Sequence, residues 1–448
     1  MIKRAIGALV LSLSGCASFW QQQPQLPATP EIDMLIDKPA NPPPLHVRPL
    51  PGHLNTKPVL SSNRPELLTS EGLIMDSATL GEGLQGEFSA FAHHVVETQP
   101  LDFAGFRLGL LARASENTAL EIQAAFFART RPEAVFIESE AHSEQTGTLW
   151  SGPGDAMALA RLQNSTRPET EALRQRYTLK AQQEHLLFEL PVPTNPLGFV
   201  GQRNALSLWL DLQAEQAVHL RWVALKSAGP GKLEDYQEAA QKTAGPAEPE
   251  ATDYDPQSAP PRGAFRFGRV SGIVQGDSWQ GSYRFQTQDW DRLKTGEALA
   301  WPVASTYLKQ WGSGQNQSAP LLRKMPGSAV ESHGNYGTYY RVRYQIQNPE
   351  ATPLRLHWRW TQPSAYQANT EPPLSYTPHK QVVFRGTVRV QNSAHETRWI
   401  HLQTRQGVWQ EPFYEQHLAA GESQEVEFAW VYPPDAIPPQ LLSVEKRP

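Results

Sequence analysis

The chain has 448 residues, 39% of which are hydrophobic, and its mean hydropathy is −0.50. At about 150 residues per domain, this length predicts two or three folded domains. Its 40 basic and 45 acidic residues give a formal net charge of −5, which argues against a nucleic-acid partner. The single cysteine, Cys16, lies in the N-terminal export signal, so the mature chain is expected to contain no disulfide bond.

Residues 1–16 have the pattern of a bacterial lipoprotein signal peptide. A basic start at residues 1–4 precedes an apolar run at 5–13 and the sequence Leu-Ser-Gly-Cys at 13–16. The apolar run is shorter than the about 20 residues that cross a bilayer, so it predicts a cleaved signal rather than a transmembrane helix. The last four residues resemble the lipobox, which implies that Cys16 is lipidated. The alternative is an ordinary signal peptide with a chance cysteine.

The residues after Cys16 predict a membrane-anchored, exported protein on the periplasmic face or the cell surface. Ala17 follows the cysteine where an aspartate would favour retention in the inner membrane, so the outer membrane is favoured. Residues 17–47 are rich in proline and predict an extended tether, because proline-rich linkers rise about 3.1 Å per residue.

The remainder of the chain predicts two all-β regions, at residues 48–228 and 263–448, joined by a Pro/Ala-rich linker at 229–262. Short alternating segments separated by turn residues are typical of β-sandwiches in tandem, of the immunoglobulin-like or a related type. The linker contains one short helical pattern at 233–242. The best longer helical candidate, at 155–176, is interrupted by Pro168.

Two stretches show the strand pattern most clearly. Leucine occupies every second position from 206 to 212. Residues 338–360 contain two alternating segments, and the prolines at 349 and 353 prevent the first from running into the second. Each segment therefore predicts a strand with one buried and one wet face.

An internal duplication is a further hypothesis. Without a gap, Phe106 falls on Tyr340 and Leu108 on Val342; later, with the offset six residues larger, Phe188 falls on Phe428. The alternative is that any two sandwiches share alternating strands.

The sequence contains no common catalytic motif. The P-loop, G-x-G-x-x-G, G-x-S-x-G and H-E-x-x-H patterns are all missing, and no second cysteine supplies a nucleophile or a zinc ligand. We therefore assign no catalytic residue and expect no cofactor and no metal, which favours a protein without enzymatic activity.

Histidines form the first candidate site. His93 and His94 would point to opposite faces of a strand, and a glycine-rich loop carries His333, Asn335 and Tyr336. Neutral imidazoles can bind a metal or act as a base near neutral pH. The alternative is a tight turn at 333–337 with histidines that hydrogen-bond to the backbone.

Two further patterns indicate binding. Asp289, Trp290 and Asp291 place an aromatic ring between two carboxylates, which suits a sugar ring, although loop tryptophans also close the ends of sandwiches. Arginines on the polar faces of the 338–360 segments would cluster if the two strands pair, and an anionic polymer or a phosphate group could bind there: Arg341, Arg343, Arg355 and Arg359. The alternative is a solvated face balanced by Glu425 and Glu427.

Several segments together resemble an uncharacterised family of exported cyanobacterial proteins, described as a domain of unknown function. They are Phe-Ala-His-His at 91–94, His-Gly-Asn-Tyr-Gly at 333–337, and the segments 48–52, 63–66, 262–274, 318–320, 383–389 and 432–439. The resemblance runs from about residue 48 to the end. It implies an exported, full-length family unit and brings no activity, cofactor or catalytic residue with it.

The main hypothesis is a lipid-anchored protein of the cell envelope with a non-enzymatic binding or structural role, in contact with glycan or another envelope protein. The alternative is a hydrolase of envelope polysaccharide whose carboxylates the sequence does not locate. A glycosidase needs two carboxyl groups about 5 to 9.5 Å apart in one cleft, whereas a binding module would present exposed aromatic residues. A cavity that holds His93 or His94 together with His333 would favour metal-assisted chemistry.

Replacing Cys16 with serine is expected to move the protein from the membrane to the soluble exported fraction, because the acceptor of the lipid is lost. Fractionation of the exporting cell measures this. Continued membrane retention of Cys16→Ser would contradict the lipobox interpretation.

Overall fold

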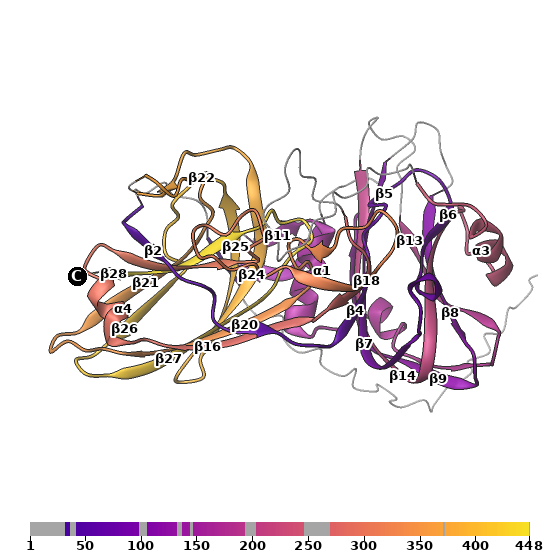
Figure 1. The fold of residues 1–448 in the computed structure, drawn as a ribbon, viewed down its shortest axis with the longest axis horizontal. Coiled ribbons are helices and arrows are strands. Elements are labelled where there is room, and N and C mark those ends of the chain that lie inside the picture. Colours follow the sequence, from indigo (N-terminus) through magenta and orange to yellow (C-terminus); the bar gives the residue numbers. More distant parts are fainter. Residues whose placement is uncertain are drawn as a thin grey trace, which may run out of the picture.

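The computed structural model describes residues 32–35, 42–97, 105–131, 137–143, 147–192, 203–245, 269–370 and 372–447. These residues form two β-sandwiches that lie side by side along the long axis of the molecule, with helix α1 (Pro153–Gln163) between them (Figure 1). The predicted all-β fold is confirmed. No helix in the described part of the chain has the length and apolarity needed to cross a membrane.

The first sandwich is built around β14 (Arg203–Lys226), which contributes to both of its layers. The N-terminal half of β14 pairs with β7 (Leu84–Glu97) and β9 (Thr118–Arg129). Its C-terminal half pairs with β8 (Phe106–Ala114) and β6 (Gly72–Asp76). The register shifts between Ala214 and Val218, where the strand passes from one layer to the other.

Both layers of the first sandwich belong to one twelve-stranded sheet, and its other strands extend the two layers. They are β4 (Pro58–Ser62), β5 (Leu67–Leu68), β12 (Arg176–Leu179), β13 (Glu184–Val192), β15 (Ser271–Gln275), β18 (Ala319–Lys324) and β19 (Glu331–Ser332). A separate hairpin consists of β10 (Ile137–Ser143) and β11 (Gly147–Ser151). A 3₁₀ turn, η1, covers Ser77–Leu80.

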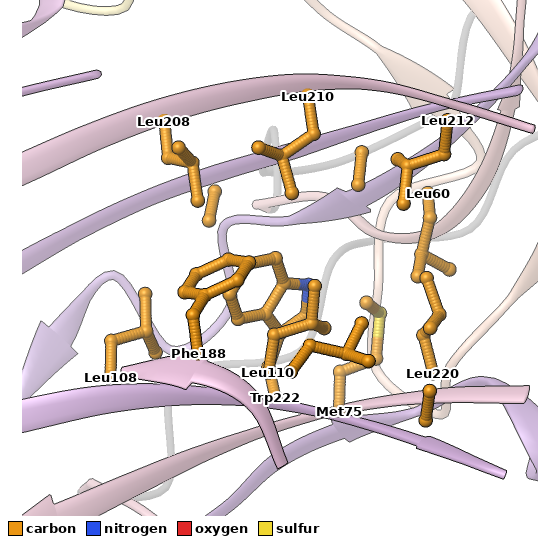
Figure 2. Close-up of a cluster of buried hydrophobic side chains, with 14 of the residues drawn as sticks. Leu60, Met75, Leu108, Leu110, Phe188, Leu208, Leu210, Leu212, Leu220 and Trp222 are labelled. Carbon is orange, nitrogen blue, oxygen red and sulfur yellow. The ribbon is translucent and has the colours of Figure 1, made fainter. Parts of the chain in front are cut away.

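Alternation along β14 decides what each face contacts. Leu206, Leu208, Leu210 and Leu212 are all fully buried and face the core between the layers, as the sequence predicts. In Figure 2, three of these leucines point toward Leu110, Phe188 and Trp222 from the opposite layer. The intervening Trp209 points the other way and packs in the cluster that contains α1.

The second sandwich consists of a seven-stranded and a five-stranded sheet. The first has the order β1 (Ile32–Leu35), β25 (Thr397–Arg405), β24 (Val382–Asn392), β27 (Ser423–Val431), β20 (Tyr339–Gln347), β16 (Ser278–Arg284) and β3 (His53–Leu54). The second has the order β2 (Leu45–Val47), β17 (Ala298–Val303), β28 (Gln440–Arg447), β21 (Leu354–Thr361) and β26 (Tyr414–Leu418). A short pair, β22 (Ala365–Tyr366) and β23 (Leu374–Ser375), lies apart from both.

The two alternating segments of 338–360 are confirmed as the strands β20 and β21, and their apolar faces are buried in one core. The two strands do not pair with each other, however. β20 lies between β27 and β16, whereas β21 lies between β28 and β26 in the opposite sheet. Two strands with one apolar face each can fill a core by facing each other across a sandwich as well as by pairing within a sheet.

The strand pairing does not follow the predicted regions 48–228 and 263–448. β15, β18 and β19 come from the second region but extend the sheet of the first sandwich, next to β4. β1 and β2 come from the predicted tether at 17–47, and β3 from the first region, yet all three pair within the second sandwich. The composition of the sequence identifies the 229–262 linker. It does not show which strands pair, because the paired strands are distant in the sequence.

The helices follow the sequence signals closely. The 155–176 candidate divides into α1 and α2 (Pro168–Glu171), because Asn164 ends α1 in the left-handed conformation and Pro168 starts the next helix. α3 (Leu233–Ala239) lies in the predicted linker and packs on the outer face of β14 through Tyr236. α4 (Thr287–Arg292) follows β16.

The two regions share the strand pairing that the duplication hypothesis expects, but their residue registers differ. β8 pairs antiparallel with β13, and β20 with β27, as equivalent strands should. Leu108 lies opposite Leu190, but Val342 lies opposite Phe428 rather than Trp430. The register therefore differs by one alternation, and the duplication stays a hypothesis.

Replacing Leu210 with alanine is expected to lower the free energy of unfolding by about 2 to 5 kcal/mol, because this fully buried side chain leaves a cavity between the layers. Urea denaturation of the soluble Cys16→Ser chain measures the change. The matched control is Leu322→Ala in β18, where the side chain is 53% exposed and the expected change is within about 0.5 kcal/mol. Equal effects of the two substitutions would contradict this core.

Candidate functional site

A polar groove runs along the outer face of the seven-stranded sheet, over β16, β20 and β27. It consists of two adjoining depressions of about 400 and 460 Å³ that share Gln345. We call it the sheet groove. Its first depression is lined by Gln280, Gly281, Ser282, Arg341, Arg343 and Glu427. Its second is lined by Arg284, Gln347, Ser393, Ser423, Gln424 and Glu425, together with the apolar Phe285 and Ile346. Strand alternation produces this surface, since the residues between these side chains on β20 fill the core.

Glu427 is the centre of the first depression. Its carboxylate accepts hydrogen bonds from Arg341 Nε at 2.8 Å and from Arg343 Nη2 at 3.0 Å, both on β20. Arg389 on β24 donates from Nη2 to the other carboxylate oxygen at 2.8 Å. The Glu427 side chain is 4% exposed, whereas those of Arg341 and Arg343 are 44% and 40% exposed. One buried carboxylate therefore holds three guanidinium groups at the surface.

A ladder of polar contacts continues from this centre into the second depression. Arg343 Nε also lies 3.0 Å from Glu425 Oε1. Gln345 donates to Glu425 at 3.3 Å and accepts from Arg284 Nε at 3.0 Å. These contacts hold side chains from three neighbouring strands in one row.

The charges of the groove do not cancel. The lining contains three arginines, Arg284, Arg341 and Arg343, and two glutamates, Glu425 and Glu427, which leaves an excess of one positive charge. Arg389, which binds Glu427 from β24, adds a further positive charge beside the groove. Burial favours the neutral form of Glu427, but its bonds to Arg341 and Arg343 outweigh this and lower its pKa. The bond to Glu427 in turn raises the pKa of Arg341.

The predicted arginine cluster is right for two residues and wrong for two. Arg341 and Arg343 share the groove with Glu425 and Glu427, as the balanced-face alternative states. Arg355 and Arg359 lie on β21 in the other sheet. Arg359 is 2% exposed and donates to Glu445 at 2.9 Å and to the Gln410 carbonyl at 2.7 Å, so it is an interior ion pair.

The sequence interpretation missed Arg284 and the glutamines of the groove, and it missed Arg389, which binds Glu427 from the neighbouring strand. The signal for Arg389 was available in the alternation of 382–392, which places this residue on the face opposite Val388 and Val390. That β24 lies beside β27, however, depends on tertiary structure.

The predicted histidine pair on β7 has an interior role. His94 is fully buried, and its ring nitrogens contact Ser62 Oγ at 3.1 Å and the Pro65 carbonyl at 2.9 Å. His93 Nδ1 lies 2.7 Å from Ser207 Oγ. Burial lowers the pKa of His94 to about 3, which keeps the imidazole neutral in the interior.

The loop of His333, Asn335 and Tyr336 is a structural turn. Asn335 has a positive φ of 50° and donates to the Gln317 carbonyl at 2.6 Å and to Tyr340 Oη at 2.9 Å. Tyr336 Oη donates to the Ala436 carbonyl at 3.2 Å. Burial lowers the pKa of His333 to about 4, and its Nδ1 lies 3.9 Å from Glu331. None of these residues, nor His93 or His94, lines the sheet groove.

Asp289, Trp290 and Asp291 belong to α4 and are not a sugar platform. Asp289 is fully buried and caps the helix by accepting from the Gln286 amide at 2.8 Å, and it also accepts from Tyr283 Oη at 2.8 Å. The Trp290 ring packs against Phe285, with ring centroids 5.4 Å apart. Asp291 is exposed and Trp290 is half-buried.

Within the described residues, no three His, Cys, Asp or Glu side chains are grouped closely enough to hold a metal ion. One row of Thr387, His401 and Asp155 has the residue types of a catalytic triad. His401 lies 3.3 Å from Thr387 Oγ1 and 3.8 Å from Asp155, and all three are at most 4% exposed. A substrate cannot reach this hydroxyl, so we interpret the row as an interior contact between α1 and the second sandwich.

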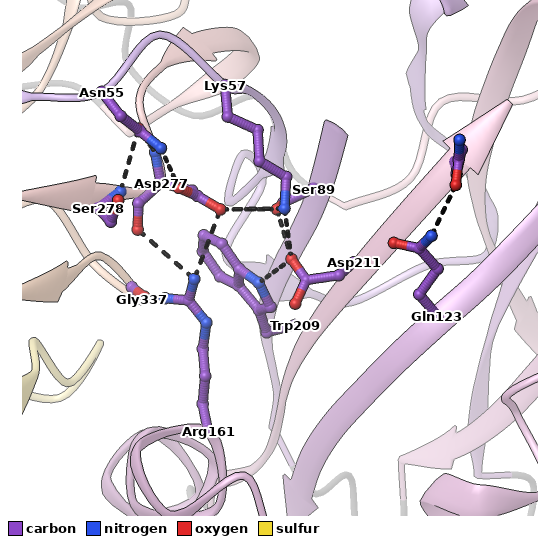
Figure 3. Close-up of polar contacts among 11 residues, drawn as sticks. Asn55, Lys57, Ser89, Gln123, Arg161, Trp209, Asp211, Asp277, Ser278 and Gly337 are labelled. Atoms are coloured by element: carbon purple, nitrogen blue, oxygen red, sulfur yellow. Dashed lines mark hydrogen bonds and ion pairs between the residues drawn. The ribbon is translucent and has the colours of Figure 1, made fainter. Parts of the chain in front are cut away.

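A partly buried ion cluster joins the two sandwiches next to the start of the groove strands (Figure 3). Lys57 lies 2.9 Å from Asp211 and 3.1 Å from Asp277, and Ser89 donates to Asp211 at 2.8 Å. Arg161 on α1 covers the Trp209 ring at 3.8 Å and binds the Gly337 carbonyl and Asp277. Burial favours a neutral Asp211, but Arg161 and Lys57 outweigh it and lower its pKa.

A second cavity, of about 300 Å³, lies between the sandwiches at the N-terminus of α1, and we call it the junction cleft. Asp155, Asp435, Arg203, Arg385 and Phe384 line it. Burial is the main reason that the pKa of Asp155 is raised; His401 opposes the rise and Asp435 adds to it. Asp435 accepts from the Gly154 amide at 2.9 Å, and a Cβ at Gly152 or Gly154 would come within 2.5 or 2.6 Å of the Asp435 carboxylate.

The fold and the groove define an all-β protein of two interleaved sandwiches with an open polar face. The chain belongs to the family described as a protein of unknown function, DUF3370, whose model matches residues 45–446. No curated protein is similar enough to match it. Among solved structures, the N-terminal CBM22-1–CBM22-2 tandem domain of Xyn10C from Paenibacillus barcinonensis is 8% identical, with a TM-score of 0.14 over 84% of this chain and 90% of that one. We infer nothing about a ligand from a likeness this low.

Stability is expected to fall as the pH is lowered from about 6.5 to 4, in part because of His333. In the unfolded chain this histidine takes up a proton near its usual pKa of about 6.5, whereas in the folded chain its pKa is about 4. The contribution is therefore fully present above pH 6.5 and is lost as the pH falls through this range.

The matched variant is His333→Gln, which has no titrating group. The difference in unfolding free energy between the two proteins is expected to change by about 3 kcal/mol between neutral pH and pH 4. Urea denaturation over this pH range measures it. A difference that does not vary with pH would show that His333 titrates normally in the folded chain.

Proposed function

We propose that this chain is a lipid-anchored protein of the bacterial cell envelope that binds glycan through the sheet groove without altering it chemically. The observation that carries the proposal is the cluster at Glu427, which holds three guanidinium groups on an open sheet face. A guanidinium has five N–H donors, so the ones that do not face Glu427 are available to a ligand.

The composition of the groove supports glycan over protein as the ligand. Its lining consists mainly of arginine, glutamine, glutamate and serine side chains, which hydrogen-bond to hydroxyl groups. A protein partner usually needs a large apolar or aromatic anchor at the centre of the interface. The large hydrophobic residues that are exposed within the described ranges, Trp150, Leu308, Leu322 and Tyr366, do not line the groove.

The anchor in this proposal is a lipid on Cys16, and the outer membrane of a double-membraned bacterium is the proposed site. β1 and β2, the first strands in the described part of the chain, both pair within the second sandwich. The sandwich that carries the groove would therefore be the one connected directly to the anchor.

Hydrolysis of an envelope polysaccharide is a second candidate, and the junction cleft supports it. Asp155 and Asp435 line the same cavity, and burial raises the pKa of Asp155. A glycosidase uses two carboxyl groups whose environments hold one protonated and one ionised. Asp155 is only 2% exposed, however, and Asp435 is held by the Gly154 amide, so both have structural partners.

The soluble Cys16→Ser chain is expected to retain a glycan fraction from solubilised envelope and to release no shorter saccharides. Affinity capture followed by chromatography of the bound and the unbound sugars measures both. If the parent chain releases saccharides and the Asp155→Asn and Asp435→Asn variants do not, the function is hydrolysis rather than binding. Retention of neither glycan nor cleavage products would contradict both candidates.

A further inference from the structure

We infer that the ligand of the sheet groove is an acidic polysaccharide, one whose sugars carry carboxylate or sulfate groups. This inference rests on the proposed function and specifies the class of glycan. It comes from the sign of the charge in the groove, the spacing of the arginines, and the different exposure and positions of the two glutamates.

The sign of the local charge is opposite to that of the whole chain. The lining has three arginines and two glutamates, an excess of one positive charge, and Arg389 adds another beside Glu427, in a protein with a formal net charge of −5. Hydroxyl groups of a neutral glycan are satisfied by amides and by balanced ion pairs, so they do not require such an excess. Anionic substituents do, and planar guanidinium groups match carboxylate and sulfate geometry well.

The arginines lie in a line rather than around one point. Arg341 and Arg343 are two residues apart on β20, and Arg284 on β16 lies opposite Gln345, two residues further along. At about 3.3 Å per residue, these three cations are spaced about 7 Å apart along the groove. From Arg341 to Gln347 the groove extends about 20 Å. A row of this kind suits a polymer with repeated charges better than a single small anion.

The two glutamates leave this row accessible. Glu427 is 4% exposed and lies beneath the three guanidinium groups that it positions. Glu425 is 37% exposed and lies between Arg343 and Gln345 in the second depression. We therefore expect the anionic groups to bind closest to Arg341, Arg343 and Arg389, and hydroxyl groups to bind Gln280 and Gln345.

The decisive experiment compares two polymers that differ only in charge. The probes are polygalacturonate and its fully methyl-esterified form, and their binding to the soluble Cys16→Ser chain is measured by calorimetry. We expect the acid form to bind at least about tenfold more tightly, and we expect this preference to weaken as salt is raised from about 50 to 500 mM, because ions screen exposed charges. This comparison of the two polymers needs no substitution in the groove.

Arg341→Gln and Arg343→Gln are each expected to weaken binding of polygalacturonate about tenfold, the usual effect of losing one charge-assisted hydrogen bond. The matched control is Arg176→Gln on β12, which removes the same charge from a side chain that is 58% exposed on the first sandwich. Arg176→Gln is expected to bind as the parent does. Thermal unfolding of each variant shows whether the fold is retained.

The outcomes separate this inference from the proposed function. Equal binding of both polymers, or retention of neutral envelope glycan alone, would overturn the acidic ligand and leave glycan binding in place. Failure to bind any glycan would overturn both. Equally tight binding to vesicles of anionic phospholipid, lost in the same arginine variants, would identify the groove as a membrane contact and overturn the inference.

Discussion

The partly buried ion cluster at the junction fixes how the two sandwiches are joined. Lys57 lies on the segment that crosses from β3 to β4, and Asp277 lies on the crossing from β15 to β16. Asp211 belongs to β14 and Arg161 to α1, so four separate parts of the chain each supply one charge. Arg161 and Asp277 are only 9% exposed, so removing either one leaves the other with less compensation in a largely desolvated place, which is unfavourable. The crossing points are therefore held in a single arrangement, with Arg161 stacked on Trp209.

This cluster also sets the position of the sheet groove. Arg161 binds the backbone carbonyls of Gly337 and Asp277, and these residues lie just before β20 and β16, the two strands that carry most of the groove. β20 then pairs with β27, which brings Glu427 opposite Arg343. The arrangement of the arginines thus depends on contacts between the sandwiches as well as on pairing within one sheet. The side chains of the groove are preorganised by their contacts with Glu425 and Glu427.

The residues that looked most functional in the sequence turned out to stabilise the fold. Histidine, asparagine and aspartate attract attention because they bind metals and move protons, but the same groups satisfy buried backbone and hydroxyl groups. His94, Asn335 and Asp289 do this at strand and helix ends. The groove can be predicted only in part: alternation places Arg341 and Arg343 on one polar face, with Glu425 and Glu427 as the balancing charges, but it groups them wrongly with Arg355 and Arg359 and does not identify Arg284, Arg389 or the glutamines. Nothing in a local motif distinguishes them from other polar positions on a strand.

Local periodicity was sufficient to identify which faces are buried. Leu206 to Leu212 and the apolar positions of β20 and β21 all lie in the cores, because a strand turns successive side chains to opposite sides whatever it pairs with. The choice of neighbours followed no such rule. β20 and β21 are adjacent in sequence yet lie in opposite sheets, while Glu427 reaches Arg341 across 86 residues. Pairing depends on which distant surfaces fit together, so the interleaved strands, the junction cluster and the groove arise only when the whole chain is folded.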